Sequence, residues 1–145
     1  MIDFALTADA VAPQLLGCTL THAGVSIRLT EVEAYLGAED SAAHTFNGMT
    51  PRNAAMFGPP GKFYVYISYG IHRNVNIVCA PDGTGQGCLL RGGEIIEGAD
   101  IAFARRGTTD FHNLARGPGN LGKALGFTLE DNHRPIQIVE RTSEP

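Results

Sequence analysis

The sequence predicts an α+β fold: a single domain in which flanking helices pack on a curved, mostly antiparallel β-sheet with a protruding β-hairpin. Runs rich in β-branched and aromatic residues are short, and few helical stretches separate them. Eighteen glycines fall in short clusters without a fixed period, as expected of a chain with many turns. A chain of 145 residues can bury one core but not two, so we expect one domain over residues 1–145.

The chain is expected to begin with a short helix and two strands. Residues 10–18 have a helical pattern that Gly17 ends. Strands are predicted at residues 18–20 and 25–34, around the turn His22-Ala23-Gly24.

The second of these strands has a conflicting pattern. The apolar residues of its first half are Val25, Ile27 and Leu29, and strict alternation places Glu31 and Glu33 on the same side. A carboxylate on the core side costs roughly several kcal/mol unless it is paired or neutralised. Two explanations stay open: a bulge resets the alternation, or the strand emerges into solvent at Glu31.

The centre of the chain predicts a β-hairpin. Residues 63–70 and 74–79 are rich in aromatic and β-branched residues and are separated by a short loop. Alternation places Tyr64 and Tyr66 on the face opposite Phe63 and Val65. Buried tyrosines would pack as part of a core.

The remaining elements are predicted from local patterns. They are a turn at 36–41 leading into a short helix through His44, a loop at 47–53, a turn at 54–57, a strand at 88–91, a helix at 97–105, a loop that becomes a helix over 116–126, and a strand at 135–139.

Composition excludes several classes of protein. A net charge of −4 argues against an indiscriminate polyanion binder, although six of the eleven basic residues fall between positions 52 and 106. The three cysteines form no Cys-x-x-Cys pair and the histidines show no metal-ligand spacing, so we expect no disulfide, metal or cofactor. No run could span a bilayer, so we expect a cytoplasmic protein without a membrane partner.

Several short motifs follow one another between about Leu15 and Leu125. They are Glu31-Val32-Glu33-Ala34-Tyr35-Leu36-Gly37, Glu39-Asp40, Ala43-His44, Thr50-Pro51-Arg52-Asn53, Met56-Phe57, Tyr64-Val65-Tyr66, Tyr69-Gly70, Asn76, Leu89-Leu90-Arg91 and, more weakly, Gly117-Pro118. In this order they resemble the alkyladenine (3-methyladenine) DNA glycosylase family.

The resemblance fades after about Phe127, so we expect a C-terminus that is shortened relative to that family. Either residues 135–139 take over part of the role of the family's last segment, or the sheet keeps an open edge.

The resemblance implies a monofunctional DNA glycosylase of base-excision repair. Such an enzyme flips an alkylated or deaminated purine, of the 3-methyladenine, 7-methylguanine and hypoxanthine class, out of the duplex and hydrolyses its N-glycosidic bond. The implied partner is double-stranded DNA containing damaged purines, bound by a monomer that associates with the nucleoid. A cationic alkylated purine is already a good leaving group, so one base and one water suffice without a cofactor.

The resemblance assigns the catalytic roles to Glu33 and Arg91. Glu33 is expected to be the general base that activates the attacking water, and burial in a partly apolar pocket would raise its basicity. Arg91 is expected to hold the water or the sugar-phosphate and to keep Glu33 ionised. The only lysines are Lys62 and Lys123, and the resemblance implies a glutamate-activated water in place of a lysine Schiff base.

The resemblance assigns the base pocket to four residues. Tyr35, His44 and Tyr66 are expected to sandwich the flipped base, because stacking favours positively charged alkylated purines. Asn76 is expected to crowd the exocyclic amine of normal guanine and so to disfavour it.

Three further residues are assigned to DNA outside the pocket. Tyr69 immediately precedes a glycine at the predicted hairpin tip, where its ring could fill the stack that the flipped base leaves. Thr50 and Arg52 are expected to contact backbone phosphates.

Two alternatives remain open. A non-catalytic domain of the same fold could bind damaged DNA without turnover, and the shortened C-terminus favours that alternative. A carbohydrate hydrolase could use Glu31 and Glu33 as an acid–base pair, because residues two apart on a strand are roughly 6–7 Å apart. That second alternative gives Tyr69 and the arginines no role.

Overall fold

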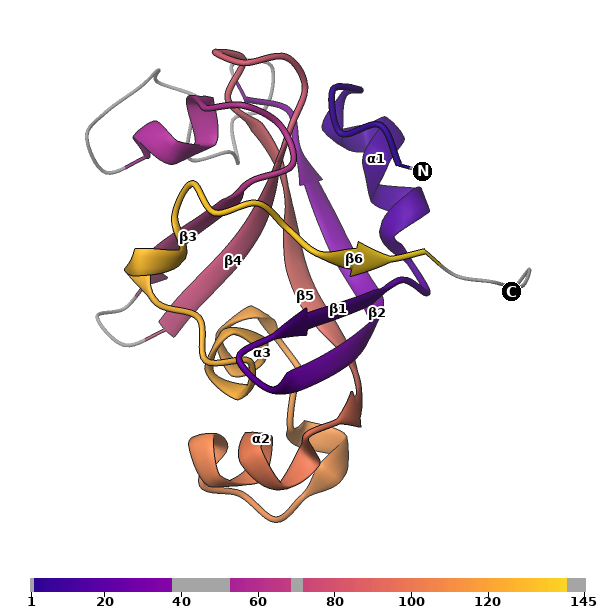
Figure 1. The fold of residues 1–145 in the computed structure, drawn as a ribbon, viewed down its shortest axis with the longest axis vertical. Coiled ribbons are helices and arrows are strands. Elements are labelled where there is room, and N and C mark those ends of the chain that lie inside the picture. Colours follow the sequence, from indigo (N-terminus) through magenta and orange to yellow (C-terminus); the bar gives the residue numbers. More distant parts are fainter. Residues whose placement is uncertain (1, 38–52, 69–71, 141–145) are drawn as a thin grey trace.

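One antiparallel sheet of six strands, in the order β3-β4-β5-β2-β1-β6, organises the molecule (Figure 1). The computed structural model describes residues 2–37, 53–68 and 72–140. The strands are β1 (Thr19–His22), β2 (Val25–Tyr35), β3 (Phe63–Ser68), β4 (His72–Cys79), β5 (Gln86–Glu97) and β6 (Ile138–Val139). The helices are α1 (Ala8–Leu15), α2 (Ala99–Arg106) and α3 (Pro118–Ala124), with 3-10 helices η2 (Ala54–Phe57), η3 (Phe111–Asn113) and η4 (Leu129–Asp131). The predicted α+β fold is confirmed.

Strand β5 is much longer than predicted. The sequence predicts a strand that stops at Arg91, before two glycines, whereas β5 continues to Glu97. Gly93 is needed because β2 lies very close: a Cβ on it would lie 2.5 Å from the backbone oxygen of Arg28, whereas a Cβ on Gly92 would meet only ordinary contacts. A glycine inside a strand can therefore mark a close backbone approach and not the end of the strand.

The main core lies between one face of the sheet and the helices. On β3, Phe63 and Val65 belong to this core, whereas Tyr64 and Tyr66 belong to a smaller cluster on the opposite face. The alternation predicted for the hairpin is thus confirmed. The largest fully buried aliphatic side chains of the main core are Leu15, Leu20, Ile27, Leu29, Ile77, Leu90, Leu114, Leu121 and Leu125.

The C-terminal segment connects the two edges of the sheet. At the β3 edge, the side chain of Asn132 accepts from the Val65 N–H at 2.6 Å and donates to the Val65 carbonyl at 3.2 Å. The Phe63 N–H donates to the Arg134 carbonyl at 2.9 Å. At the other edge β6 pairs with β1, and Figure 1 shows the segment running across the front of the sheet between them. A strand was predicted at residues 135–139, and only Ile138 and Val139 form one, paired with β1. Of the two alternatives left open for this segment, its pairing with β1 favours the one in which it extends the sheet.

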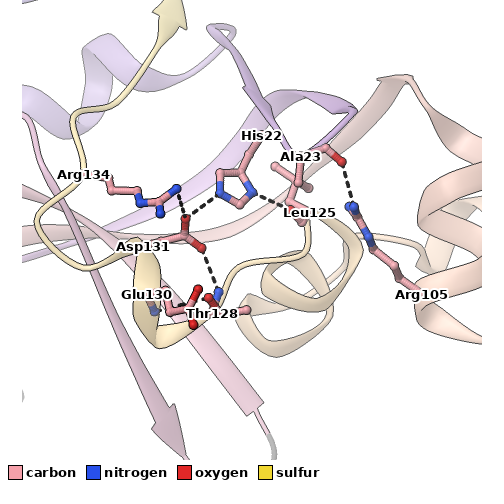
Figure 2. A network of polar contacts seen from close by, with 8 residues as sticks. All are labelled: His22, Ala23, Arg105, Leu125, Thr128, Glu130, Asp131 and Arg134. Carbon is pink, nitrogen blue, oxygen red and sulfur yellow. Dashed lines mark hydrogen bonds and ion pairs between the residues drawn. The ribbon is translucent and has the colours of Figure 1, made fainter.

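A polar network attaches this segment to β1 (Figure 2). His22 contacts the Leu125 carbonyl through Nδ1 at 2.6 Å and Asp131 Oδ1 through Nε2 at 3.0 Å. Its ring stacks on Phe127 with centroids 3.8 Å apart. Asp131 Oδ2 accepts from the Thr128 N–H at 2.8 Å, which closes a capping box at the start of η4.

Among the described helices, none is both long and apolar enough to cross a membrane.

Candidate active site

Two β-bulges lie side by side where β2 and β5 pair. Leu29 is opposite Gly93 and Glu31 is opposite Gly92, so Thr30 has no partner on β5. Val32 is opposite Leu90, so Arg91 has no partner on β2. At this point each strand thus carries one extra residue, in addition to the unpaired Ile96 further along β5, and each extra residue reverses the face to which the following side chains point.

The bulges resolve the conflict in the β2 pattern. Before the bulge Leu29 lies in the main core, and after it Val32 and Ala34 pack against that core. Glu31 and Glu33 therefore point away from the main core, to the other face of the sheet, which is called the outer face below. Of the two explanations left open by the sequence, the bulge is the one found.

The outer face collects the described residues of the predicted site. Residues Tyr64, Asn76, Leu89 and Glu33 are successive cross-strand partners on β3, β4, β5 and β2. Asn76 is buried, and its side chain donates to the Tyr64 carbonyl at 3.4 Å. The backbones that carry Glu33 and Asn76 are two strands apart, or about 10 Å.

An aromatic cluster forms one side of this face. Tyr35 and Tyr66 are partly buried and pack against Met56 and Tyr64. The Tyr64 and Tyr66 rings lie 5.5 Å apart at an interplanar angle of 30°. The predicted base-pocket tyrosines therefore belong to one cluster, although Tyr35 is the last residue of β2 and Tyr66 lies on β3.

Glu33 binds its two neighbours through one oxygen. Tyr35 Oη donates to Glu33 Oε1 at 2.6 Å, and Arg91 Nη1 donates to the same atom at 3.1 Å. Glu33 Oε2 makes no hydrogen bond to the part of the chain that the structure describes. The predicted pairing of Glu33 with Arg91 is present, and among the described residues nothing donates to the second carboxylate oxygen.

Arg91 is positioned by a second carboxylate that the sequence did not assign to it. Its Nε donates to Glu31 Oε1 at 2.9 Å. The hydrogen bond with Glu31 and the negative charge of Glu33 raise the pKa of the Arg91 guanidinium, even though slight burial opposes the shift. The signal available in the sequence was the spacing of the two glutamates, which was interpreted only as an acid–base pair.

The exposure of these groups differs from the expectation. The Glu33 side chain is 47% exposed, so the desolvation expected from an apolar pocket is not found. The carboxylate of Glu33 is surrounded on one side by two hydrogen-bond donors, Tyr35 and Arg91, and not by an apolar pocket. Partial burial and the hydrogen bond to Glu33 raise the pKa of Tyr35 above its usual range, so this hydroxyl remains a proton donor in the hydrogen bond.

A hollow of about 380 Å³ adjoins the arginine. Glu31 and Arg91 line one side of it, and His112, Arg116 and Gly117 line the other. A backbone bridge between Gly92 and Arg116 brings this later segment to β5. Arg116 was not singled out from the sequence, because nothing local indicates that the segment returns to the sheet.

Four predicted site residues lie outside the described residues. They are His44, Thr50, Arg52 and Tyr69. The structure therefore assembles Glu33, Arg91, Tyr35, Tyr66 and Asn76 on one face. Within residues 2–37, 53–68 and 72–140, no three His, Cys, Asp or Glu side chains come together in a way that could hold a metal ion.

Comparison with known proteins adds the family. A carboxylate held at one oxygen by an arginine and a tyrosine, with no donor to its other oxygen among the described residues, lies beside an aromatic cluster and defines a candidate active site. The chain belongs to the methylpurine-DNA glycosylase (MPG) family, whose model matches residues 2–143. The match extends well beyond Phe127, where the sequence resemblance was expected to fade.

Curated bacterial proteins are similar over most of the chain. A protein of Corynebacterium efficiens is 66% identical over 99% of this chain and 78% of its own length. A protein of Corynebacterium glutamicum is 66% identical over 93% of this chain and 72% of its own length. One of Cutibacterium acnes is 55% identical over 96% of this chain and 73% of its own length. All three carry the name "Putative 3-methyladenine DNA glycosylase".

Proposed function

We propose that this DNA glycosylase is monofunctional and removes alkylated or deaminated purines from duplex DNA, using a water molecule that Glu33 activates. The observation that carries the proposal is the asymmetric use of the Glu33 carboxylate. Tyr35 and Arg91 both donate to Oε1, whereas Oε2 has no donor among the described residues. A carboxylate fixed through one oxygen can accept a proton from water through the other.

The reaction follows from this geometry. As water attacks C1′, one of its protons passes to Glu33 Oε2, the new C1′–O bond forms and the C1′–N bond to the purine breaks. The electrons of the broken bond go to the base, which neutralises a purine that alkylation has made cationic. A deaminated purine such as hypoxanthine is neutral before cleavage, so it leaves as an anion and takes up a proton from solvent water. Arg91 holds Glu33 Oε1 in an ion pair before attack, and the raised pKa of Tyr35 keeps its hydroxyl available as a donor.

The outer face provides the base pocket in this proposal. Tyr35 and Tyr66 would contact the faces of a flipped purine, and His44 would complete the sandwich. Asn76 would act from β4, about 10 Å from the Glu33 backbone, against the exocyclic amine of guanine. Tyr69 would fill the vacated stack, while Thr50 and Arg52 would contact phosphates.

A single-turnover assay with Glu33→Gln tests this proposal. Duplex oligonucleotides carrying hypoxanthine or 7-methylguanine would be incubated with excess wild-type or variant protein, and released base would be measured. We expect the variant to lose base release by a factor on the order of 10³, because the amide cannot accept the proton. Lesion binding should remain within a few fold of the wild-type value.

Glu94→Gln serves as a matched control, because Glu94 is an exposed glutamate on β5 whose only described ion-pair partner is Arg28. It should release base at the wild-type rate. Base release that persists in Glu33→Gln, or equal loss of release and binding, would contradict the role of Glu33. Wild-type protein that binds the lesion without releasing base would support the non-catalytic alternative.

A further inference from the structure

A second hollow, lined by basic side chains, lies on the α3 side of the sheet. It has a volume of about 360 Å³, which is within the range of ligand sites. Its lining residues are His72, Arg73, Arg106, Gly119, Asn120 and Lys123. No acidic side chain is among them, although the chain as a whole has a net charge of −4.

Two glycines of α3 bring these residues together. A Cβ on Gly122 would overlap the backbone oxygen of Arg73, and a Cβ on Gly119 would overlap the His72 ring. The glycines therefore allow α3 to lie directly against the first residues of β4. This contact places Asn120 and Lys123, from the helix, beside His72 and Arg73, some fifty positions earlier in the chain.

The cations of the hollow are not neutralised by nearby carboxylates. Arg73 and Lys123 are exposed and form no ion pair with the described residues. Arg106 is fixed from behind, because Nε donates to the Leu114 carbonyl at 3.0 Å and Nη2 donates to the Asn113 carbonyl at 3.1 Å. The two acceptors are uncharged carbonyls, so they orient the Arg106 guanidinium without neutralising its positive charge at the hollow.

The basic hollow is linked by shared lining residues to the hollow beside Glu31 and Arg91. His72, Gly119 and Asn120 also line a smaller hollow of about 290 Å³, which reaches Arg116. Arg116 and Gly117 in turn line the hollow that contains Glu31 and Arg91. A row of adjoining hollows thus leads from Arg73 and Lys123 to the catalytic arginine. An extended polyanion could occupy both ends of this row at once.

We propose that the hollow formed by Arg73, Arg106 and Lys123 binds a backbone phosphate of the DNA duplex whose damaged base occupies the Glu33 site. The inference rests on the proposed function and adds a phosphate site separate from Thr50 and Arg52. Three cations lining one hollow suit a phosphodiester, because charge-assisted hydrogen bonds from guanidinium and ammonium groups are the usual phosphate contacts. Such a contact positions the duplex without reading its sequence.

The test is the salt dependence of binding to an undamaged duplex, for which no base release interferes. Wild type, Arg73→Gln, Lys123→Gln and the double variant would be titrated with labelled duplex between about 50 and 200 mM salt. A plot of log affinity against log salt concentration has a negative slope, and each lost phosphate contact should make it shallower by about 0.9. This corresponds to a loss of about eightfold in affinity at 0.1 M salt, relative to the affinity at 1 M. The loss should be the same for duplexes of different sequence.

Lys62→Gln provides the matched control. Lys62 is the only other lysine and immediately precedes β3, where it is bridged to Pro135. Since Phe63 pairs with Ile77 and Ser68 pairs with His72, Lys62 lies at the far end of the hairpin, roughly 20 Å from the hollow. Its substitution should leave the slope within about 0.3 of the wild-type value.

Three results would overturn the proposal. The first is that the double variant binds the undamaged duplex with the same slope and affinity as the wild-type protein. The second is that the wild-type protein itself does not bind the undamaged duplex. The third is a double variant that loses binding of inorganic phosphate but keeps the wild-type duplex slope, which would assign the hollow to a free anion. Base release from a lesion duplex by wild type, measured in parallel, reports on the proposed function separately. Equal melting temperatures of all variants would exclude a folding defect.

Discussion

Two carboxylates, Glu33 and Asp131, are each bound by more than one donor, yet they differ in how many of their oxygens are bonded and in their exposure. Asp131 uses both oxygens: Oδ1 faces His22 at 3.0 Å and Arg134 at 3.9 Å, while Oδ2 accepts from the Thr128 N–H at 2.8 Å (Figure 2). Glu33 uses only Oε1, within the described residues. The Asp131 side chain is 7% exposed, against 47% for Glu33.

The comparison separates a structural carboxylate from a candidate catalytic one. The two ring nitrogens of His22 contact the Leu125 carbonyl and Asp131 Oδ1, so the ring lies between two segments near the C-terminus. Asp131 therefore completes a closed network that fixes the C-terminal segment. Asp131 is buried and bonded at both oxygens, whereas Glu33 is half exposed and, among the described residues, has one oxygen without a donor.

The same chemical change at the two carboxylates should have opposite effects. Glu33→Gln is expected to remove base release with little change in stability. Asp131→Asn should lower the free energy of unfolding by about 2 kcal/mol, because a buried acceptor is replaced by a donor facing His22 or Thr128. The melting temperature should fall by roughly 6 °C, with single-turnover base release at 25 °C unchanged. Thermal unfolding followed by circular dichroism measures the melting temperature, and the single-turnover assay measures base release.

This contrast would fail if Asp131→Asn lost base release at a temperature where it is fully folded. It would also fail if Glu33→Gln lowered the melting temperature as much as Asp131→Asn does.

A smaller effect is expected at Glu31, which contacts Arg91 but not the proposed water. Glu31→Gln weakens the hydrogen bond from Arg91 Nε, so the Arg91 side chain should be less well fixed and should donate to Glu33 for a smaller fraction of the time. We expect the single-turnover rate at saturating DNA to fall about tenfold, within the range of general-base effects, while the apparent DNA affinity stays within twofold.

Glu94→Gln is the control for this effect. Arg28 and Glu94 form an exposed pair across the same two strands, at 3.2 Å, with side chains 52% and 51% exposed. Loss of such a pair changes stability by less than about 1 kcal/mol. If Glu31→Gln behaves like Glu94→Gln, the Glu31 contact is only another surface ion pair.

The smallest effect concerns acid stability. Burial opposes the ionisation of Asp131, but the hydrogen bond from the Thr128 N–H and the contact with His22 prevail and lower the pKa of Asp131. A carboxyl whose folded pKa is depressed stabilises the protein above its unfolded pKa, near 3.9, and loses that contribution as the pH falls through the folded pKa. The stability difference between wild type and Asp131→Asn should therefore narrow between about pH 5 and pH 3.

Chemical denaturation of both proteins at several pH values measures this difference. A gap that stays constant, or that widens toward pH 3, would show that the Asp131 charge does not stabilise the native state.

Much of the fold followed from local pattern. The faces of Phe63, Tyr64, Val65 and Tyr66 were predicted correctly because alternation needs no information beyond the strand itself. The order of the motifs likewise placed Glu33 and Arg91 in one site, and the 3.1 Å contact between them is present. The length of β5 was wrong because two glycines resemble a turn signal when their neighbour β2 is not known.

The sequence by itself determined which residues carry the proposed chemistry and which strands present them. Only the tertiary structure decided the direction in which Glu31 and Glu33 point. The paired bulges at Thr30 and Arg91 depend on how β2 and β5 align, and a pattern within either strand cannot specify that register. The basic hollow has the same origin, because it forms only where α3 lies against β4 through Gly119 and Gly122. Contacts between distant segments are set by packing, which local spacing does not encode.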